Sequence, residues 1–570
     1  MSDPMFNVAL NIVERAQLAS RIERYKTADR PVNTGGRKLS IPSHVAVTLL
    51  LIQALEGDRA CHVTTAATNV LQRLSPEQCT ALGIQVPTVF EKRSSAAHKR
   101  WRDRIHASLD ALFRLIDPHW NPNRRNRWLK ADWNAHMQAR DPDIVERKME
   151  RLYDFNNAIL RATTELLPAK YREKFQGARA VDGTSYRTSC RGTSEKSNRM
   201  SVEPNAWWYN RNSKDKKLDN TKPKFHGYEA TLFIWTKEFT NDPDEYPFLV
   251  DAMAHNPPAK AASEIVVRAA RTLFENNAKV STLRADNQYW AGQNIDKFHQ
   301  PLWTMGFKPV TSYRSGQRGL QGEAQHGAVR IDGDLYCPSI LDAPNLVNVG
   351  DDYMSGRIDR DKVRERIAAR EPYLLKNKHK TPFGDKRVMM CPAKRGTLDC
   401  SLRQDLSAAN DRLGLPIFPV ASAGAICDNK HSTTFGTPSK FEQEYRYLTD
   451  EWFEAYGQRS QVESFNNDLK NSALGSRNGI RLRGFAAVAL VSALCVASVN
   501  VQRINTFVAR KTEEAEGRRS RAASRSRSRR KSGWTDDLET TPTPGDDPDF
   551  VRKEPRTGVR LSVEDSPPDD

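Results

Sequence analysis

The order in which hydrophobic patterns follow one another along the chain most constrains its fold. Up to about residue 174, apolar residues recur at helical spacing, and no alternating strand-like run interrupts them. From Ala178 the pattern changes to short β-like runs, followed by a helix-like run at 260–276 and a further strand-like run that ends at Asp286. This order predicts an α/β fold, in which a mixed sheet follows an all-helical N-terminal region.

The remainder of the chain divides into three further segments. A loop-rich stretch with short strand-like runs reads as a β-rich insertion, after which helical spacing returns. The end is a low-complexity basic run followed by an acidic, Pro-rich run, and it has too few apolar residues to form a core. The expected segments are a helical, DNA-binding region at 1–174, the first part of the core at 175–312, the insertion at 313–447, core helices at 448–511 and a disordered tail at 512–570.

The charge of the chain favours a polyanionic partner. Its 570 residues include 88 Lys and Arg against 70 Asp and Glu, a net charge of +18. Two N-terminal segments, 91–106 and 119–133, mix these cations with Trp101, Trp120, Trp128 and Trp133. Such mixing suits phosphate neutralisation with base packing. The alternative is solvated helix faces with the tryptophans in the core.

One apolar stretch, Gly484 to Val501, is long enough to suggest a membrane span. Because it is rich in Ala, Ser and Gly and lacks an aromatic belt, a buried helix of a soluble protein is the stronger prediction. Eight cysteines without a CxxC pair, and a start without a signal-peptide pattern, favour the cytoplasm.

Two aspartates follow strand-like runs. Asp182 comes after a β-like run and before Gly183-Thr184, and Asp286 ends the run VSTLRAD. The ends of strands are where α/β sheets place their chemistry, although Asp also ends strands for purely structural reasons. Each aspartate alone is therefore a weak signal.

A helical segment near the C-terminus carries a third carboxylate among cations. Tyr456, Arg459, Glu463 and Lys470 stand at offsets of 0, 3, 7 and 14. At ~100° per residue they fall within roughly 60° of one α-helix face. The alternative is a solvated helix face. A helix that lies along a phosphate backbone would require this pattern, with cations that hold phosphates on either side of a metal-binding carboxylate.

The spacing Tyr456-x2-Arg459-x3-Glu463-x6-Lys470 resembles the Y-R-E-K signature of cut-and-paste insertion-sequence transposases. These enzymes form the DDE group, with an RNase H-like catalytic core. Asp182 in AVDGT and Asp286 in LRADNQ resemble the first and second acids of that family. The motifs DGDLYCP, CPAKRG and ICDNKHSTTF are similar to a subgroup common in actinobacteria. The separations of 104 and 177 residues between successive acids imply an insertion before Glu463.

The resemblance implies a site and its partners. Asp182, Asp286 and Glu463 would be catalytic and would hold two Mg ions, for which Mn can substitute, while Tyr456, Arg459 and Lys470 would support the DNA phosphates. Carboxylates without a His cluster suit Mg better than Zn. The implied activity is DNA phosphodiester hydrolysis and strand transfer. Its partners would be double-stranded DNA, at terminal repeats and target, and a second copy in a synaptic homodimer, with no membrane.

Four cysteines fall within the expected insertion: Cys337, Cys391, Cys400 and Cys427. They could ligate a structural Zn, with His431 in place of one thiol. Because their spacing is irregular, buried thiols without a metal are the competing interpretation.

Other functions remain open at this point. A nuclease on the same fold would cut without joining strands, and a domesticated DNA-binding protein would keep the fold without the activity. The Arg-Ser run at the C-terminus raises RNA binding as a third alternative.

Overall fold

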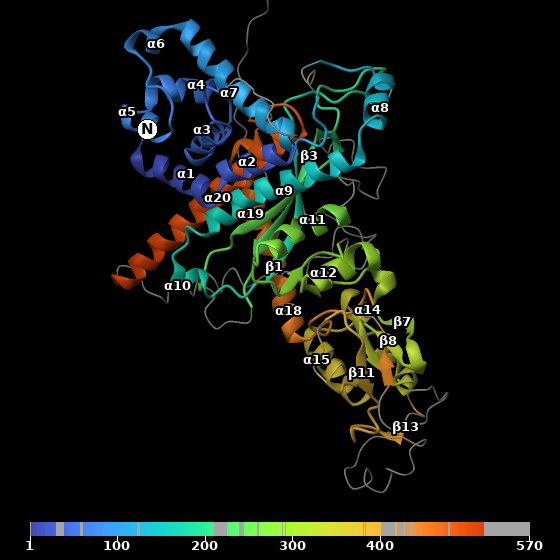
Figure 1. Cartoon of the computed structure of the whole chain (residues 1–570). Helices are drawn as coiled ribbons and strands as arrows, with labels where there is room; N and C mark the ends of the chain where they lie inside the picture. The colour runs from blue at the N-terminus through green and yellow to red at the C-terminus, as the bar shows by residue number, and fades with distance from the viewer. Residues whose placement is uncertain are drawn as a thin grey trace, which may run out of the picture.

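The computed structural model of the chain consists of a helical region, a mixed sheet with helices on both faces, and a lobe inserted after the sheet (Figure 1). The structure describes residues 2–29, 39–57, 61–121, 126–194, 196–209, 225–238, 244–258, 262–287, 289–290, 292–379, 381, 383–400, 417–418, 427, 433–436, 439–476 and 479–517. The expected tail at 512–570 lies mostly outside these residues.

Helices fill the N-terminal region, as the spacing of its apolar residues predicted. They are α1 (Asp3–Arg15), α2 (Leu18–Asp29), α3 (Ser43–Leu55), α4 (Val63–Thr68), α5 (Pro76–Ala81), α6 (Val89–Arg93), α7 (Ser95–Ile116), α8 (Lys130–Gln138), α9 (Pro142–Thr164) and α10 (Ala169–Arg172), with a π-helical turn η1 (Asn69–Arg73) after α4. Trp101 and Trp133 are buried, so these two tryptophans belong to the core rather than to an exposed binding surface.

The sheet mixes parallel and antiparallel strands, which confirms the expected α/β class. Its strands are β1 (Arg179–Arg187), β2 (Trp207–Tyr209), β3 (Phe225–Trp235), β4 (Val250–Asn256), β5 (Thr282–Arg284) and β6 (Lys308–Val310). The order is β2-β3-β1-β5-β6, and β4 also pairs with β3. Strand β3 is antiparallel to β1, β2 and β4, whereas β1, β5 and β6 run parallel.

Different helices cover the two faces of the sheet. On one face Val181 and Phe233 pack with α11 (Ala262–Glu275), close to the helix expected at 260–276. On the other face Ala180 and Leu232 belong to a core that contains α20 (Phe485–Ala515) and much of the N-terminal region. Alternation along β1 therefore decides which side chains point toward α11 and which toward α20.

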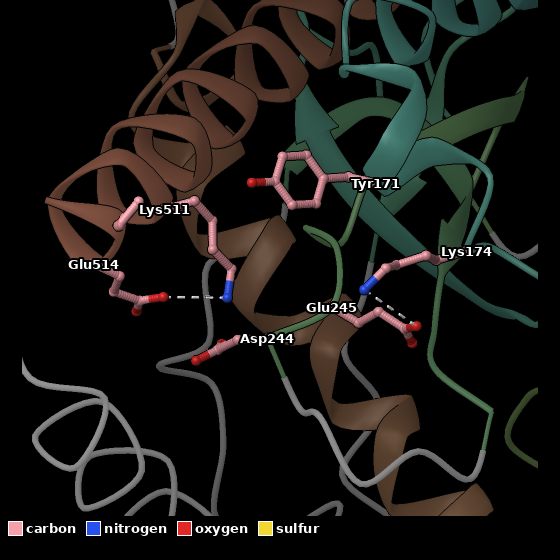
Figure 2. A pocket seen from close by; sticks show the side chains of 7 residues that line it. Tyr171, Lys174, Asp244, Glu245, Lys511 and Glu514 are labelled. Atoms are coloured by element: carbon pink, nitrogen blue, oxygen red, sulfur yellow. Dashed lines mark hydrogen bonds and ion pairs between the residues drawn. The ribbon is translucent and has the colours of Figure 1, made fainter.

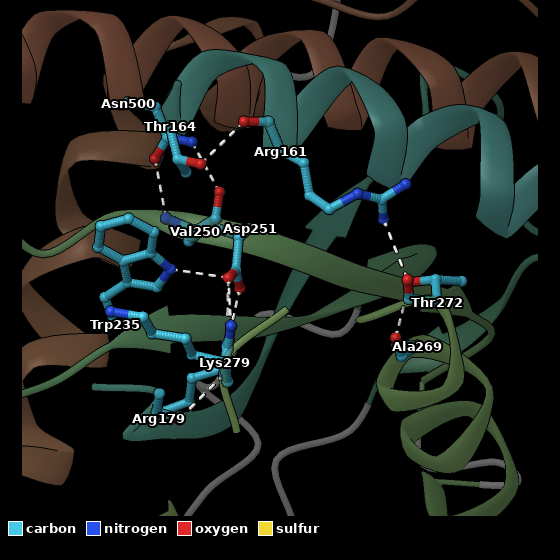
Figure 3. Close-up of polar contacts among 11 residues, drawn as sticks. Arg161, Thr164, Arg179, Trp235, Val250, Asp251, Ala269, Thr272, Lys279 and Asn500 are labelled. Atoms are coloured by element: carbon cyan, nitrogen blue, oxygen red, sulfur yellow. Dashed lines mark hydrogen bonds and ion pairs between the residues drawn. The ribbon is translucent and has the colours of Figure 1, made fainter. Parts of the chain in front are cut away.

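Side chains from two helices satisfy backbone groups of strand β4. Asn157 of α9 accepts from the Met253 amide through Oδ1, and Asn500 of α20 both accepts from and donates to the Val250 backbone. Figure 3 shows Asn500 beside Val250. Such pairing protects a sheet edge from unwanted strand addition.

A buried ion pair lies at the start of β1. The Arg179 guanidinium donates to the carboxylate of Asp251 on β4, and the two side chains are 1% and 5% exposed (Figure 3). The indole Nε1 of Trp235 donates to the same carboxylate at 2.7 Å. Arg179 also donates to the carbonyl oxygens of Gly177 and Lys279. These bonds tie β1, β3 and β4 together where the sheet begins.

Helix α20 contains the apolar stretch that suggested a membrane span. Among the described residues it is the one helix long and apolar enough to cross a bilayer, but 94% of its apolar window is buried inside the protein. It runs on to Ala515, a few residues past the expected boundary at 511. Burial of this kind matches the predicted core helix of a soluble protein.

The insertion forms a lobe with its own hydrophobic core (Figure 1). Its strands are β7 (Leu320–Glu323), β8 (Val329–Ile331), β9 (Asp334–Tyr336), β10 (Lys376–Asn377), β11 (Arg387–Met390), β12 (Asp399–Cys400), β13 (Ile417–Phe418) and β14 (Thr433–Phe435). The sequence did not predict its helices, α13 (Pro344–Val347), α14 (Val349–Met354) and α15 (Arg360–Ala369). They escaped prediction because α13 and α14 span only four and six residues and α15 has one buried apolar side chain, Val363.

Candidate active site

The register of the sheet places Asp182 and Asp286 side by side. Strands β1 and β5 pair in parallel, with Arg179 opposite Leu283 and Ala180 opposite Arg284. The same offset, continued by two residues beyond the hydrogen-bonded pairs, puts Asp182 opposite Asp286. Because opposite residues of parallel strands point to the same face, both carboxylates belong to the face that α20 covers.

The sequence suggested that Asp182 lies at the end of a strand, but in the structure it lies within one. Strand β1 continues to Arg187, and Asp182 pairs with Leu232 of β3 in its middle. It is the neighbouring strand β5 that stops, at Arg284. The side chain of Asp182 is 26% exposed.

Glu463 lies on a helix that packs against the same face. Helix α19 (Gln461–Lys470) buries Val462, Phe465 and Leu469, which join the core formed with Ala180 of β1. Glu463 itself is exposed, next to the buried Val462. The apolar side of α19 therefore fixes the helix on the sheet and leaves the carboxylate near the two aspartates.

The segment with the predicted stripe is not one continuous α-helix. Helix α18 (Asp450–Gly457) ends at Gly457, and a 3₁₀ turn, η8 (Gln458–Ser460), connects it to α19. The calculated 60° wedge for Tyr456, Arg459, Glu463 and Lys470 assumed 100° per residue throughout, so it does not apply here. The 3₁₀ turn instead places Arg459 between the two helices.

Arg459 faces the carboxylates. Its Nη1 atom lies 4.0 Å from Oδ2 of Asp182. Its guanidinium carbon lies 5.7 Å from the centre of the Tyr456 ring, which in turn stacks on Trp452. The hydroxyl of Tyr456 donates to Ser312 Oγ at 3.1 Å. Tyr456 thus helps to hold the guanidinium beside Asp182.

The acids influence one another electrostatically. The pKa of Asp182 is raised to about 6: burial raises it most, the negative charges of Asp286 and Glu463 also raise it, and Arg459 and the Gly183 amide lower it. The amide of Gly183 donates to Oδ1 of Asp182 at 2.8 Å. Three like charges that interact across one surface call for a compensating cation.

The donor set suits a hard divalent cation. Asp182, Asp286 and Glu463 offer carboxylate oxygens alone, which is the chemistry that Mg prefers. Over the described ranges, however, no three His, Cys, Asp or Glu side chains are gathered closely enough to form a ready-made metal cage. The donors fit Mg, and the carboxylates would have to draw closer around it.

Lys470 lies apart from this cluster, at the C-terminal end of α19, two helical turns beyond Glu463. It is exposed, and its ammonium group donates to Oδ1 of Asn467 at 3.4 Å. The structure therefore groups Arg459 with the acids and leaves Lys470 on the open surface of the helix.

Two further residues that the sequence analysis did not identify lie around Gly183, the neighbour of Asp182 in β1. A Cβ atom on Gly183 would lie 2.7 Å from Oε1 of Glu229 and 3.2 Å from the hydroxyl of Tyr289. Burial raises the pKa of Tyr289, and the charges of Asp182, Glu229 and Asp286 raise it further. A glutamate within the apolar run YEATLFIW was a usable signal for Glu229, whereas nothing local marked Tyr289.

The four cysteines of the insertion share its core. Cys337, Cys391, Cys400 and Cys427 are all buried there. Burial raises the pKa of the Cys337 thiol to about 11, and the nearby Cys391 and Cys427 contribute to this increase. They are not among any described group suited to hold a metal, so a structural Zn stays a prediction.

A separate hollow of about 440 Å³ lies between α10, residues 244–245 and the end of α20 (Figure 2). Its charged side chains are matched to one another: Lys511 bonds to Glu514, Lys174 pairs with Glu245, and Arg510 pairs with Asp244. None of the three acids of the candidate site lines it. This balance of charges gives no sign of a specific ligand.

The chain was compared with known proteins and structures. No protein-family model, curated protein or solved structure matches this chain.

Proposed function

We propose that this chain is a DDE-type DNA transposase that cleaves DNA and joins strands at the ends of a mobile element. The observation that carries the proposal is the shared register of Asp182 and Asp286, together with Glu463 on the helix that packs on the same face. Their mutual effect on the pKa of Asp182 supports one site rather than three separate surface acids.

The sheet supports an RNase H-like core for this activity. Strand β3 is antiparallel to both β1 and β4, and helix α11 follows these strands along the chain. Beyond β1 the sheet continues with β5 and β6, which run parallel to β1. The first acid lies on β1 and the second directly after β5. The third comes from a helix far along the chain, after the inserted lobe.

The residues fit the chemistry of phosphoryl transfer. Asp182, Asp286 and Glu463 would hold Mg, which when bound makes a water or a 3′-hydroxyl nucleophilic and stabilises the leaving oxygen. Arg459 would hold the Asp182 carboxylate ionised and offer donors to a DNA phosphate. Lys470, two turns along α19, would contact the DNA backbone farther from the reacting bond.

The overall charge agrees with a DNA partner. A chain with a net charge of +18 attracts polyanions over long distances and releases counterions on binding. A second copy of the chain would be needed to hold two element ends together, so we also propose a homodimer on DNA.

A strand-transfer assay tests this function against its alternatives. The purified chain would be incubated with Mg, a plasmid target and duplexes made from the DNA on either side of its own coding region. A transposase yields duplex ends joined to the plasmid, and EDTA abolishes them. Cleavage without joining would indicate a nuclease, and DNA binding without cleavage a domesticated protein.

A further inference from the structure

Helix α6 exposes two apolar side chains at one turn. Phe90 is 89% exposed, the highest value among the large hydrophobic side chains that the structure describes, and its neighbour Val89 is 70% exposed. Val86, just before the helix, is 40% exposed. In Figure 1, α6 lies at the outer end of the helical region. Three apolar side chains exposed within five residues offer burial energy to a partner that covers them.

The turn that carries Phe90 is fixed rather than loose. Thr88 and Glu91 form a capping box, in which the Glu91 amide donates to Thr88 Oγ1 and the Thr88 amide donates to the Glu91 carboxylate. Directly after it, the Ser94 hydroxyl accepts from the Ala97 amide and begins α7. Two capped helix starts in succession hold Phe90 at a set position relative to α7.

Cations surround this apolar tip. Lys92 and Arg93 are exposed in the last turn of α6, and Lys99 and Arg100 are exposed on α7. Glu91 lies 3.7 Å from Arg100, close enough to offset part of that charge. The surface thus presents an apolar point within a positive field, which complements the stacked bases and phosphates of a nucleic acid duplex.

We propose that α6 and the first turns of α7 bind duplex DNA, with Phe90 inserted as a wedge between adjacent base pairs. Lys92, Arg93, Lys99 and Arg100 would contact the flanking phosphates. The wedge unstacks one base step and bends the duplex, and the bend brings more phosphates within reach of the cations. This inference rests on the proposed function for its partner, DNA, but it concerns a surface separate from the carboxylates.

Phe90→Ala in the full chain provides the test. The probe is a 30-base-pair duplex of generic sequence with a donor and an acceptor dye at its two ends, so that energy transfer reports bending and anisotropy reports affinity. We expect Phe90→Ala to abolish the bend and to weaken binding about tenfold, as loss of one aromatic stacking contact does. Phe90→Trp should retain both. The salt dependence should fall in Phe90→Ala, because the unbent duplex offers fewer phosphates to the cations, and it should fall by about one unit in Lys99→Ala, which loses one phosphate contact.

Phe274→Ala is the matched control, because Phe274 is a half-exposed phenylalanine on α11, outside this surface. It should bind and bend DNA like the parent chain. An unchanged bend and affinity in Phe90→Ala would overturn the wedge while leaving the proposed function intact, whereas a parent chain that binds no duplex would overturn both. A Phe90→Ala variant that changes only self-association, or only binding to anionic phospholipid vesicles, would assign the surface to another partner and overturn the proposal.

Discussion

Asp182 on β1 and Asp286, two residues past the end of β5, fall opposite each other when the parallel register of the two strands is continued. This relationship follows from the length of β5, which stops at Arg284 and leaves one side of β1 without a neighbour. Asp182 interacts electrostatically with Glu463 and Arg459 as well as with Asp286.

We predict that loss of the Arg459 charge shifts the pH dependence of Mg-dependent DNA cleavage. Arg459 lowers the pKa of Asp182 against the effects of burial and the neighbouring acids. In Arg459→Ala that pKa rises above about 6, so the carboxylate ionises at higher pH and the acidic limb of the rate profile moves to higher pH. In Arg459→Lys, which keeps the positive charge, the acidic limb should lie closer to its parental position than in Arg459→Ala. An acidic limb at the parental position in Arg459→Ala would show that the guanidinium does not act on Asp182.

Lys470→Ala should affect DNA binding rather than the pH profile. Lys470 is exposed and bonded to Asn467, away from the acids, so its removal deletes a phosphate contact alone. The slope of log affinity against log salt should fall in magnitude by about one unit, with the acidic limb of the rate profile unchanged. Titrations of labelled duplex at several salt concentrations measure the slope. A slope equal to that of the parent chain would show that Lys470 does not contact a DNA phosphate.

Asp182→Asn should stabilise the metal-free protein above pH 6. The carboxyl has a pKa of about 6 in the folded chain and an ordinary value near 3.8 when unfolded, so ionisation destabilises the fold as pH rises between these values. In EDTA at pH 8, the melting temperature of Asp182→Asn should exceed that of the parent by about 1–2 °C. The difference should vanish by pH 4. Conversely, Mg should stabilise the parent more than the variant, and equal stabilisation would argue against Asp182 as a ligand.

The buried pair of Arg179 and Asp251 should matter far more for stability than an exposed one. Arg179→Ala leaves the Asp251 carboxylate buried, with the Trp235 indole still donating to it, and should lower the free energy of unfolding by about 3–5 kcal/mol. Lys174→Ala is the matched control, because its pair with Glu245 spans 3.8 Å at the surface. That change should cost less than about 1 kcal/mol in denaturant titrations. An equal loss of unfolding free energy in the two variants would contradict a structural role for the buried pair of Arg179 and Asp251.

Sequence patterns predicted the strands and the long helices of the core because these elements bury continuous apolar runs. The β-like runs after Ala178 became β1, β3 and β4, the run at 260–276 became α11, and the apolar stretch from Gly484 became the first part of α20. The same patterns placed Asp182 at a strand end, because the run after it, Gly-Thr-Ser-Tyr-Arg, lacks the apolar alternation that marks a strand. Its β structure depends on pairing with β3 over the full length of β1, a long-range contact that no local pattern contains.

The sequence predicted which residues belong to the candidate site better than it predicted how they are arranged. The carboxylates and Arg459 were identified from spacing and resemblance, and the structure does bring these four side chains within electrostatic reach of one another. The stripe on a single helix was wrong, because the η8 turn lies between Tyr456 and Glu463. Tyr289 and Glu229 come close to Gly183, next to Asp182, only through folding, since Gly183 leaves space for both side chains.

The central claim is that Asp182, Asp286 and Glu463 form one metal-dependent site for phosphoryl transfer. The most direct test measures Mg-dependent cleavage of end-containing duplex by Asp182→Asn, Asp286→Asn and Glu463→Gln, at DNA concentrations that saturate each variant. Glu451→Gln, which changes an exposed glutamate of α18, serves as the control. We predict that each of the three variants binds DNA within about twofold of the parent and cleaves it about a thousandfold more slowly or worse, while the control cleaves normally. Cleavage at the parental rate by any one of the three would contradict the account.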